Sequence, residues 1–409
     1  MIFLQITLLT ASASLLAQLT TLPELYKKAA TSAATIAMSE SRIAQKDAKL
    51  EQIKGEYLPM VSLATNYAIE DGAHQGKIAL SQSLYNGGKS LASWQIVKIE
   101  KKLEEYNFLK AQVKLYLEVA TAFFKYHSAG QDMINLQASI ELTNKRLMEL
   151  KQRRAIGRSR QGEVLMAESQ LYIAKSQISL AQGQQGEAQR ALQLLTNISS
   201  DELTMGGSFS EKLEEVKDVE EYLSKIDAHP EVVAQTLDYE LKIKAQSKVQ
   251  KGHYPKVDLI GNYYLWRSDT SGGVTSGNDD WDLSLGISLP LYSGGTTAAQ
   301  VKETSAQAVE SKWQLEETKK VLRFNIKNRY ESLKNLRQQL LLLEQALLAA
   351  EKNYKEQERD YHHSLVTTLE LLQAVNSYQE AKRSMDKMKF QTFLALEELK
   401  AAAFEIPQF

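Results

Sequence analysis

The sequence predicts a mainly α-helical protein with a small β part, built from two similar halves. Three observations lead to this fold class. The chain has only 6 Pro in 409 residues, so long helices can run without interruption. Four short stretches alternate apolar and polar residues, which is typical of half-buried strands. The motif Leu-Tyr-x-Gly-Gly occurs twice, at Leu84 and at Leu291, which are 207 residues apart (291 − 84 = 207).

Each copy of this motif ends an alternating run and begins a long helical pattern. A pair of glycines adopts backbone angles that other residues resist, so it suits a sharp corner between a strand and a helix. The two corners consist of Tyr85, Gly87, Gly88, Tyr292, Gly294 and Gly295. A corner that recurs at a fixed distance indicates a duplicated unit.

We expect four segments along the chain. Residues 1–17 are mostly apolar and uncharged, which predicts a signal peptide cleaved after Ala17 or Ala13. The alternative for this segment is a first core helix or a wrongly assigned start codon. Residues 18–195 form the first helix–hairpin–helix repeat, residues 196–227 a connector with a solvated acidic run, and residues 228–409 the second repeat.

The strands are expected at about 59–69, 77–85, 256–266 and 281–291, joined by a turn at 71–76 and a longer polar loop at 268–280. Each has roughly ten residues, the length of a transmembrane β-strand. One face is apolar and the other small or polar, which suits lipid on one side and water on the other. Aromatic residues near the strand ends are expected to form a girdle at the membrane surface: Tyr67, Tyr263, Trp266 and Trp281.

Four strands cannot close a barrel, and open strand edges cannot lie in lipid. A membrane-embedded chain of this kind must therefore oligomerise, so that each copy contributes four strands to a shared transmembrane β-barrel. The alternative is a small soluble sheet at the end of a coiled-coil rod.

The helices follow the same order in both halves. They are expected at 23–54, 89–154, 163–195, 230–250, 296–361 and 368–403. The second and fifth would each be roughly 100 Å long at about 1.5 Å per residue. The helices at 23–54 and 163–195 could stack end to end beside the long helix of the first half.

Composition excludes several classes of protein. The 49 basic and 50 acidic side chains give a near-zero net charge, which does not support a nucleic-acid partner. The absence of cysteine excludes disulfides and thiolate metal sites. No grouping of catalytic residues is recognisable, so we expect no enzyme and no cofactor. His362 and His363 are adjacent on a helix and point apart, so no metal site is expected there.

The duplicated plan resembles the TolC-like outer membrane efflux proteins, the outer membrane factor family. The Gly-Gly corners carry this resemblance, together with the turn motifs that run from Gly157 to Ala167 and from Leu369 to Ala374. The resemblance implies that long helical hairpins from three chains form an α-helical barrel in the periplasm. It also implies a shared outer membrane β-barrel, and an adaptor (a membrane fusion protein) with an inner-membrane pump as partners.

The resemblance also implies functional residues at the two helical turns. Glu370 matches an acidic position at the closed periplasmic entrance, Gln373 stands where a second acid is common, and Glu163 is equivalent to Glu370 in the first repeat. Three copies of Glu370 near one axis would favour cations and raise the carboxylate pKa. The alternative for both glutamates is a helix N-terminal carboxylate stabilised by the helix dipole.

Adaptor docking is expected at the tips of the same turns. The candidate residues are Arg154, Gly157, Arg158, Ser159, Arg160, Tyr361, His363, Ser364, Leu365 and Val366. The basic first tip could instead be an ordinary exposed turn. The function implied is an exit duct of a tripartite efflux or type I secretion system. The alternative is a periplasmic or surface coiled-coil interaction protein with a small β-sheet.

Overall fold

The computed structural model describes residues 21–67, 74–198, 213–268, 274–275, 281–363 and 365–407. The expected signal peptide and Ser364 lie outside these residues. The chain divides into two compact units. Unit 1 consists of residues 1–36, 111–226 and 322–409, and unit 2 of residues 37–110 and 227–321.

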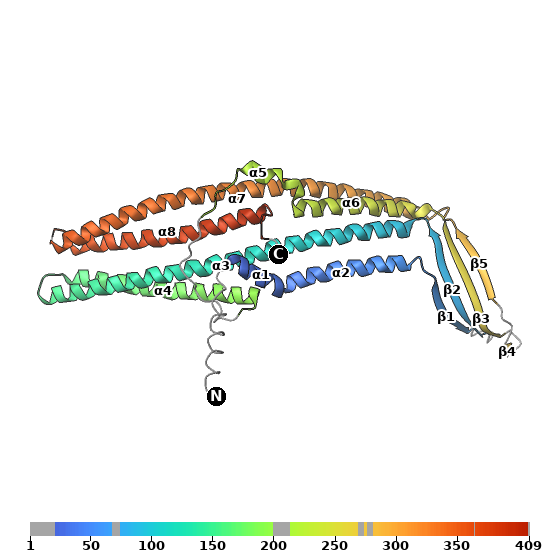
Figure 1. Ribbon diagram of the computed structural model, residues 1–409, viewed down its shortest axis with the longest axis horizontal. Coiled ribbons are helices and arrows are strands. Elements are labelled where there is room, and N and C mark those ends of the chain that lie inside the picture. The colour runs from blue at the N-terminus through green and yellow to red at the C-terminus, as the bar shows by residue number, and fades with distance from the viewer. Residues whose placement is uncertain are drawn as a thin grey trace, which may run out of the picture. The chain divides into compact units, whose positions relative to one another are not determined.

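The structure is mainly helical with one small sheet, which confirms the predicted fold class (Figure 1). The two longest helices, α3 and α7, have 67 residues each. The described elements are, in order, α1 (Leu22–Ser32), α2 (Ala34–Gly55), β1 (Met60–Tyr67), β2 (His74–Asn86), α3 (Lys89–Ala155), α4 (Gln161–Thr196), α5 (Val219–Ser224), the 3-10 helix η2 (Ile226–Ala228), α6 (Pro230–Gln250), the 3-10 helix η3 (Lys251–His253), β3 (Lys256–Ser268), β4 (Val274–Thr275), β5 (Trp281–Ser288), α7 (Thr296–His362) and α8 (Thr368–Ala402).

The first predicted helix is in fact two helices, α1 and α2, which are separated at Ala33. The backbone of Ala33 is extended, with φ −71° and ψ 120°. Just before it, the hydroxyls of Thr31 and Ser32 donate to the carbonyl of Lys28 at 2.8 and 3.0 Å. Such side-chain bonds to the backbone compete with the helical pattern. The Ser32 hydroxyl also donates to the Leu195 carbonyl at 3.3 Å, which ties the end of α1 to the end of α4.

The sheet of unit 2 has the strand order β1–β2–β3–β5, and all of these pairings are antiparallel (Figure 1). β1 and β2 form the expected hairpin of the first repeat. β2 then pairs along its length with β3, which belongs to the second repeat. Within the described residues, β1 and β5 each have one neighbouring strand, so both edges of the sheet are open.

The registers join the apolar sides of all four strands into one face. Val61 lies opposite Leu80, Leu80 opposite Gly261, and Gly261 opposite Leu283. The apolar face carries Val61, Leu63, Tyr67, Ile78, Leu80, Leu259, Tyr263, Trp281, Leu283, Leu285 and Ile287. The other face is mainly small or polar, although Met60, Ile260 and Tyr264 also lie on it. On this face the Asn262 amide donates to Asp282 at 2.9 Å.

Two strand ends differ from the prediction. The turn expected at 71–76 is wrong for residues 74–76, because β2 already begins at His74. The pairing of β2 with β3 has a bulge there. The Trp266 ring lies so close to Gly76 that a Cβ on this residue would be 2.2 Å from a ring carbon. The last strand was expected to reach Leu291 but ends at Ser288. Pro290 follows and has no N–H for pairing.

Four short elements were not predicted, and one of them, η3, directly follows α6. β4, a two-residue strand, lies in the expected polar loop and pairs with the end of β3. α5 and η2 lie in the expected connector. The side chain of Asp218 caps α5 by accepting from the Val219 N–H at 2.8 Å.

The Gly-Gly corners have the backbone geometry that only glycine adopts easily. The φ angles are +69° at Gly87, +74° at Gly88, +62° at Gly294 and +80° at Gly295. A Cβ on Gly87 would also lie 2.8 Å from the Cβ of Tyr254. The turn from strand to helix therefore requires glycine for its angles, and at Gly87 also for space.

One part of the core of unit 1 lies where α1, α3 and α8 pack together. Tyr26 and Tyr116 make an edge-to-face contact with ring centroids 5.1 Å apart. Phe124 and Phe393 are stacked at 6.1 Å. Arg383 of α8 forms a two-pronged ion pair with Asp132 of α3, at 2.6 and 3.0 Å. These apolar and bidentate contacts fix α8 against α3.

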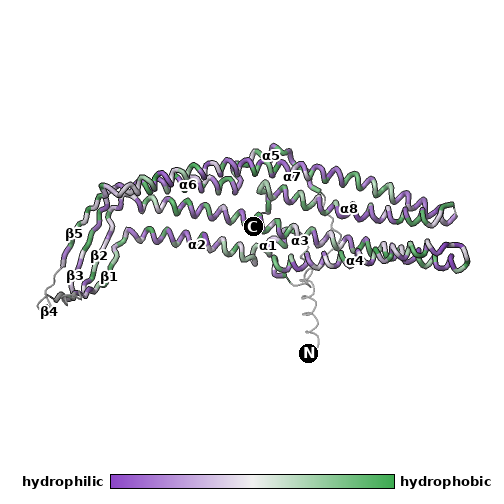
Figure 2. The backbone as a smooth tube through the Cα atoms, turned by 180° about the vertical axis from the view of Figure 1, so that it is seen from behind, coloured by the Kyte–Doolittle hydropathy of each residue, from purple (hydrophilic) through white to green (hydrophobic). Residues whose placement is uncertain are grey.

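Unit 2 is held by contacts between neighbouring helices. Lys46 of α2 pairs with Glu100 of α3 at 2.7 Å, and Lys101 pairs with Asp47 at 2.7 Å. None of the helices in the described residues has a stretch apolar enough to span a membrane. Figure 2 shows why, since hydrophobic and hydrophilic residues alternate at short intervals along the helices.

The first turn of α6 is capped by His229. Its ring nitrogen Nδ1 accepts a hydrogen bond from the Glu231 N–H at 3.2 Å. Burial lowers the pKa of His229, as does the charge of Lys110, while Glu231 acts in the opposite direction. His229 is therefore neutral in the folded state at neutral pH, as its role as an acceptor requires.

We predict that the protein loses stability as the pH falls below about 6.5, the ordinary value for histidine. The unfolded chain then binds a proton that folded His229 resists, so the free energy of unfolding decreases towards acid. His127, whose pKa burial also lowers, acts in the same direction. His229→Asn keeps a capping side chain worth about 0.5–2 kcal/mol without titrating. The change in Tm between pH 7.5 and pH 5 should therefore be smaller in this variant. An unchanged difference would assign the effect to other groups.

Candidate functional site

The two helical turns of unit 1 close with the same backbone hydrogen bond. At the first turn the Arg158 N–H donates to the Arg153 carbonyl at 2.8 Å, and at the second the Leu365 N–H donates to the Asp360 carbonyl at 2.9 Å. Both residues of the second pair are 207 positions after those of the first (360 − 153 and 365 − 158). The Gly157 N–H also donates to Arg154, and Gly157 has φ +75°. The first turn is thus a Schellman motif closed by glycine.

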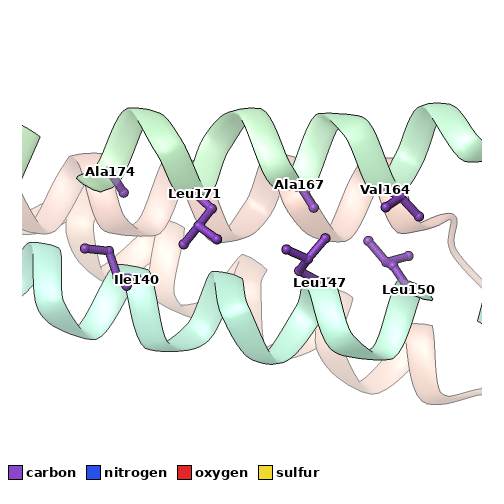
Figure 3. Close-up of a cluster of buried hydrophobic side chains, with 7 residues drawn as sticks. All are labelled: Ile140, Leu147, Leu150, Val164, Ala167, Leu171 and Ala174. Atoms are coloured by element: carbon purple, nitrogen blue, oxygen red, sulfur yellow. The ribbon is translucent and has the colours of Figure 1, made fainter. Parts of the chain in front are cut away.

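Beneath the first turn, α3 and α4 meet through small and branched apolar side chains (Figure 3). α3 contributes Ile140, Leu147 and Leu150, and α4 contributes Val164, Ala167, Leu171 and Ala174. Figure 3 shows these side chains pointing towards one another between the two helices. Lys151 and Glu168 add an ion pair between the same helices at 2.8 Å. The turn therefore rests on a rigid hairpin.

Beneath the second turn, Tyr361 is buried with Leu371 and Val375, and is 4% exposed. The Arg153 guanidinium lies over the Tyr361 ring, 4.4 Å from its centroid. This cation–π contact links the first turn to the second. Tyr361, one of the expected docking residues, therefore supports the turn from inside and is not part of its outer surface.

A buried arginine crosses between the same two hairpins. Arg146 of α3 donates to Glu358 of α7 at 2.5 Å and to Glu149 at 2.9 Å. Burial by itself lowers the pKa of Arg146, but its hydrogen bond to Glu149 and the charges of Glu149 and Glu358 raise it overall. The residue was not predicted. Arg146 lies four residues before buried Leu150, on the apolar side of α3. This spacing is the signal in the sequence that could have predicted its burial.

Glu370 forms a capping box with Thr367 at the start of α8. Its carboxylate accepts from the Thr367 N–H at 2.7 Å, and its own N–H donates to the Thr367 hydroxyl at 3.3 Å. The Thr367 N–H and the Thr367 hydroxyl both donate to this carboxylate and hold the pKa of Glu370 below its usual value. In the single chain Glu370 is thus an exposed helix-capping carboxylate, and its pKa shifts opposite to the rise expected for a ring of three.

Glu163 occupies the same position in α4 that Glu370 occupies in α8. Each is the third residue of its helix, and Glu163 accepts a hydrogen bond from the Ser159 hydroxyl. Glu163 is half-buried and Gln373 is exposed. The dipole of each helix favours a carboxylate at this position.

Most of the expected docking residues lie at the surface of the two turns. Ser159 and Val366 are half-buried, and the exposed residues are Arg154, Gly157, Arg158, Arg160, His363 and Leu365. Ile156, which was not predicted, is 66% exposed beside them, and Leu365 is 73% exposed. The tips therefore combine basic and apolar side chains. No group of three metal-ligating side chains occurs in the part of the chain that the structure describes.

Comparison with known proteins gives one family. Residues 25–197 and 228–403 match the family described as outer membrane efflux protein. The chain is 24% identical over 317 residues to outer membrane protein TolC of Escherichia coli (strain K12), covering 71% of this chain and 63% of TolC. It is 25% identical over 279 residues to TolC of Vibrio cholerae serotype O1, covering 64% of this chain and 63% of that protein. The alignments thus span less than two thirds of these relatives.

Two solved structures have the same fold. A membrane protein from Pseudomonas aeruginosa superposes with a TM-score of 0.82 at 17% identity, covering 93% of each chain. The outer membrane protein VceC from Vibrio cholerae superposes with a TM-score of 0.80 at 19% identity, covering 93% of this chain and 95% of VceC. The shared fold consists of long antiparallel helical hairpins for a helical barrel and strands for a β-barrel.

The family match covers both repeats, and the shared fold includes both the hairpins and the sheet. The chain therefore belongs to the outer membrane efflux protein family, and its place is the outer membrane, with the helical part in the periplasm.

Proposed function

We propose that this protein is the exit duct of a tripartite efflux or type I secretion system. Three copies form the duct, a periplasmic adaptor docks at the helical turns, and an inner-membrane pump supplies the energy. The duct conducts substrates passively and catalyses no reaction. It spans the periplasm with its helices and the outer membrane with its strands.

The observation that supports this proposal best is the two-faced sheet with open edges. Its apolar face runs across all four long strands, while β1 and β5 have unpaired outer edges in the described chain. Unpaired backbone groups are costly in lipid, so these edges require strands from other copies. Three copies supply twelve strands, with lipid on the apolar side and water on the polar side.

The gate of the duct lies at the helical turns in this proposal. Glu370 of each copy forms a ring of like charge around the entrance. Gln373, one turn further along α8, and Glu163, the equivalent residue of α4, also contribute to the gate. A ring of carboxylates attracts cations and repels anions. Because Glu370 also caps α8, its charge and its structural role have to be separated by experiment.

The adaptor docks on the exposed tips in this proposal. The surface consists of basic Arg154, Arg158 and Arg160 beside apolar Ile156 and Leu365. Gly157 shapes the first tip and Tyr361 supports the second from below. Ser159, His363 and Val366 complete the docking surface.

The membrane face can be tested with neighbouring residues of β5. Leu285→Lys should reduce insertion into lipid vesicles, because a charge on the lipid face costs about 2–4 kcal/mol near the middle of a membrane. Ser284→Lys, on the polar face, is the matched control and should insert like the wild type. Insertion is measured as the fraction of protein protected from protease after refolding into vesicles. Equal insertion of both variants, or failure of the control, would contradict the assignment of the faces.

The gate can be tested by single-channel conductance in a planar bilayer. We expect small wild-type conductance that rises in Glu370→Ala, together with weaker preference for cations, because the variant removes three charges from the entrance. Glu370→Gln is the control, since glutamine keeps the capping box without the charge. It should behave like the alanine variant.

A change in conductance in the alanine variant alone would assign Glu370 a capping role. Unchanged conductance in both variants would show that the gate lies at other residues. Folded, detergent-extracted protein that forms no channels would favour the coiled-coil rod.

A further inference from the structure

A groove of about 250 Å³ runs between α3 and α6 in unit 2. α3 lines it with Trp94, Lys98 and Lys102, and α6 lines it with Leu237, Glu240 and Lys244. Trp94, Leu237 and Lys244 are half-buried, and the other three residues are exposed. The groove thus has an apolar floor and an excess of positive charge.

The groove lies within one chain and near the strand ends. α3 is bound to α2 on one side through Lys46–Glu100. α6 is bound to α7 through the Asp238 carboxylate, which accepts from Ser311 at 2.8 Å. The Lys251 ammonium, just after α6, donates to the Gly88 carbonyl just before α3, at 3.2 Å. Trp94, the first groove residue on α3, lies a few residues after Gly88. At about 1.5 Å per residue, the groove begins about 10 Å along α3 from the strand end.

The three lysines of the groove are unpaired, in contrast to their neighbours. Lys46 and Lys101 form ion pairs between α2 and α3. Within the described residues, Lys98, Lys102 and Lys244 form no ion pair, although Glu240 lies four residues before Lys244. Lys98 instead lies over the Trp94 ring, 5.1 Å from its centroid. Like charges four residues apart, as in Lys98 and Lys102, destabilise a helix.

We propose that this groove binds an anionic amphiphile. Lys98, Lys102 and Lys244 hold its phosphate or carboxylate head, and Trp94 with Leu237 covers the first part of its apolar chain. A bound anion would remove the repulsion between the lysines, and charge-assisted hydrogen bonds to phosphate are among the strongest in proteins. Aromatic and apolar walls with a few charged groups are typical of small-molecule sites.

Two sources could supply such a ligand, and they share this chemistry. One is a phospholipid of the membrane leaflet next to the sheet, whose head group would reach the start of the helices. The other is a soluble anionic compound with an alkyl or aromatic part. The inference does not depend on the proposed duct, because binding is measured without conduction.

The test is calorimetric titration of the full-length protein in neutral detergent with hexyl phosphate. The triple variant Lys98→Gln, Lys102→Gln, Lys244→Gln should bind about tenfold or more weakly. The control replaces three exposed lysines of α7 in the same way: Lys302→Gln, Lys312→Gln and Lys320→Gln. It should bind like the wild type. Trp94→Leu keeps every lysine. It should weaken the binding of hexyl phosphate more than the binding of inorganic phosphate.

Equal binding by the wild type and the triple variant would overturn the proposal. Binding of inorganic phosphate as tight as that of hexyl phosphate would also overturn it, because an amphiphile site requires the chain to contribute. Native mass spectrometry with dioleoyl phosphatidylglycerol then distinguishes the sources. Loss of retained lipid in the triple variant identifies a phospholipid, and equal retention identifies a soluble anion.

Discussion

The pairing of β2 with β3 is the contact on which the sheet depends. These strands belong to different repeats, and their register decides whether two separate hairpins share one apolar face. Because side chains alternate along a strand, a shift by one residue would turn half of that face over. With Leu80 opposite Gly261, most apolar residues of all four strands lie on one side. The Gly-Gly corners then lead from this sheet into helices of 67 residues.

The same duplication organises the opposite ends of the long helices. Both turns close with the same backbone bond, and both following helices begin with a glutamate at their third position. What differs is the support beneath them. The first turn rests on the apolar contacts between α3 and α4. The second rests on Tyr361, which is covered by Arg153, and on Glu358, which pairs with Arg146. Two polar contacts between the hairpins therefore lie beneath the second turn, in addition to those such as Arg383–Asp132 further along the helices.

Side-chain periodicity allowed the long helices, the strands and the faces of the strands to be predicted, because these depend on local spacing. Periodicity failed to predict the structure where its signal was weak, or where contacts with residues distant in the chain determined the local structure. The break at Ala33 follows two hydroxyls that bond back to Lys28, in a sequence of good helix formers. At its extended start, β2 pairs His74 with Tyr67 of β1 and Gln75 with Arg267 of β3, which is almost two hundred residues away. Tyr361 was expected at the docking surface because the family resemblance places adaptor contacts at this turn, but Leu371 and Val375 of α8 pack against it.

The sequence by itself determined the repeated plan, the Gly-Gly corners, the alternating strands and the positions of the turns. Glycine angles, helical spacing and strand alternation are properties of neighbouring residues. Only the tertiary structure decided the register of β2 on β3, the burial of Tyr361 and Arg146, and the groove lined by Trp94 and three unpaired lysines. Each of these brings together side chains from helices or strands far apart in the chain, and local periodicity does not specify which distant elements meet.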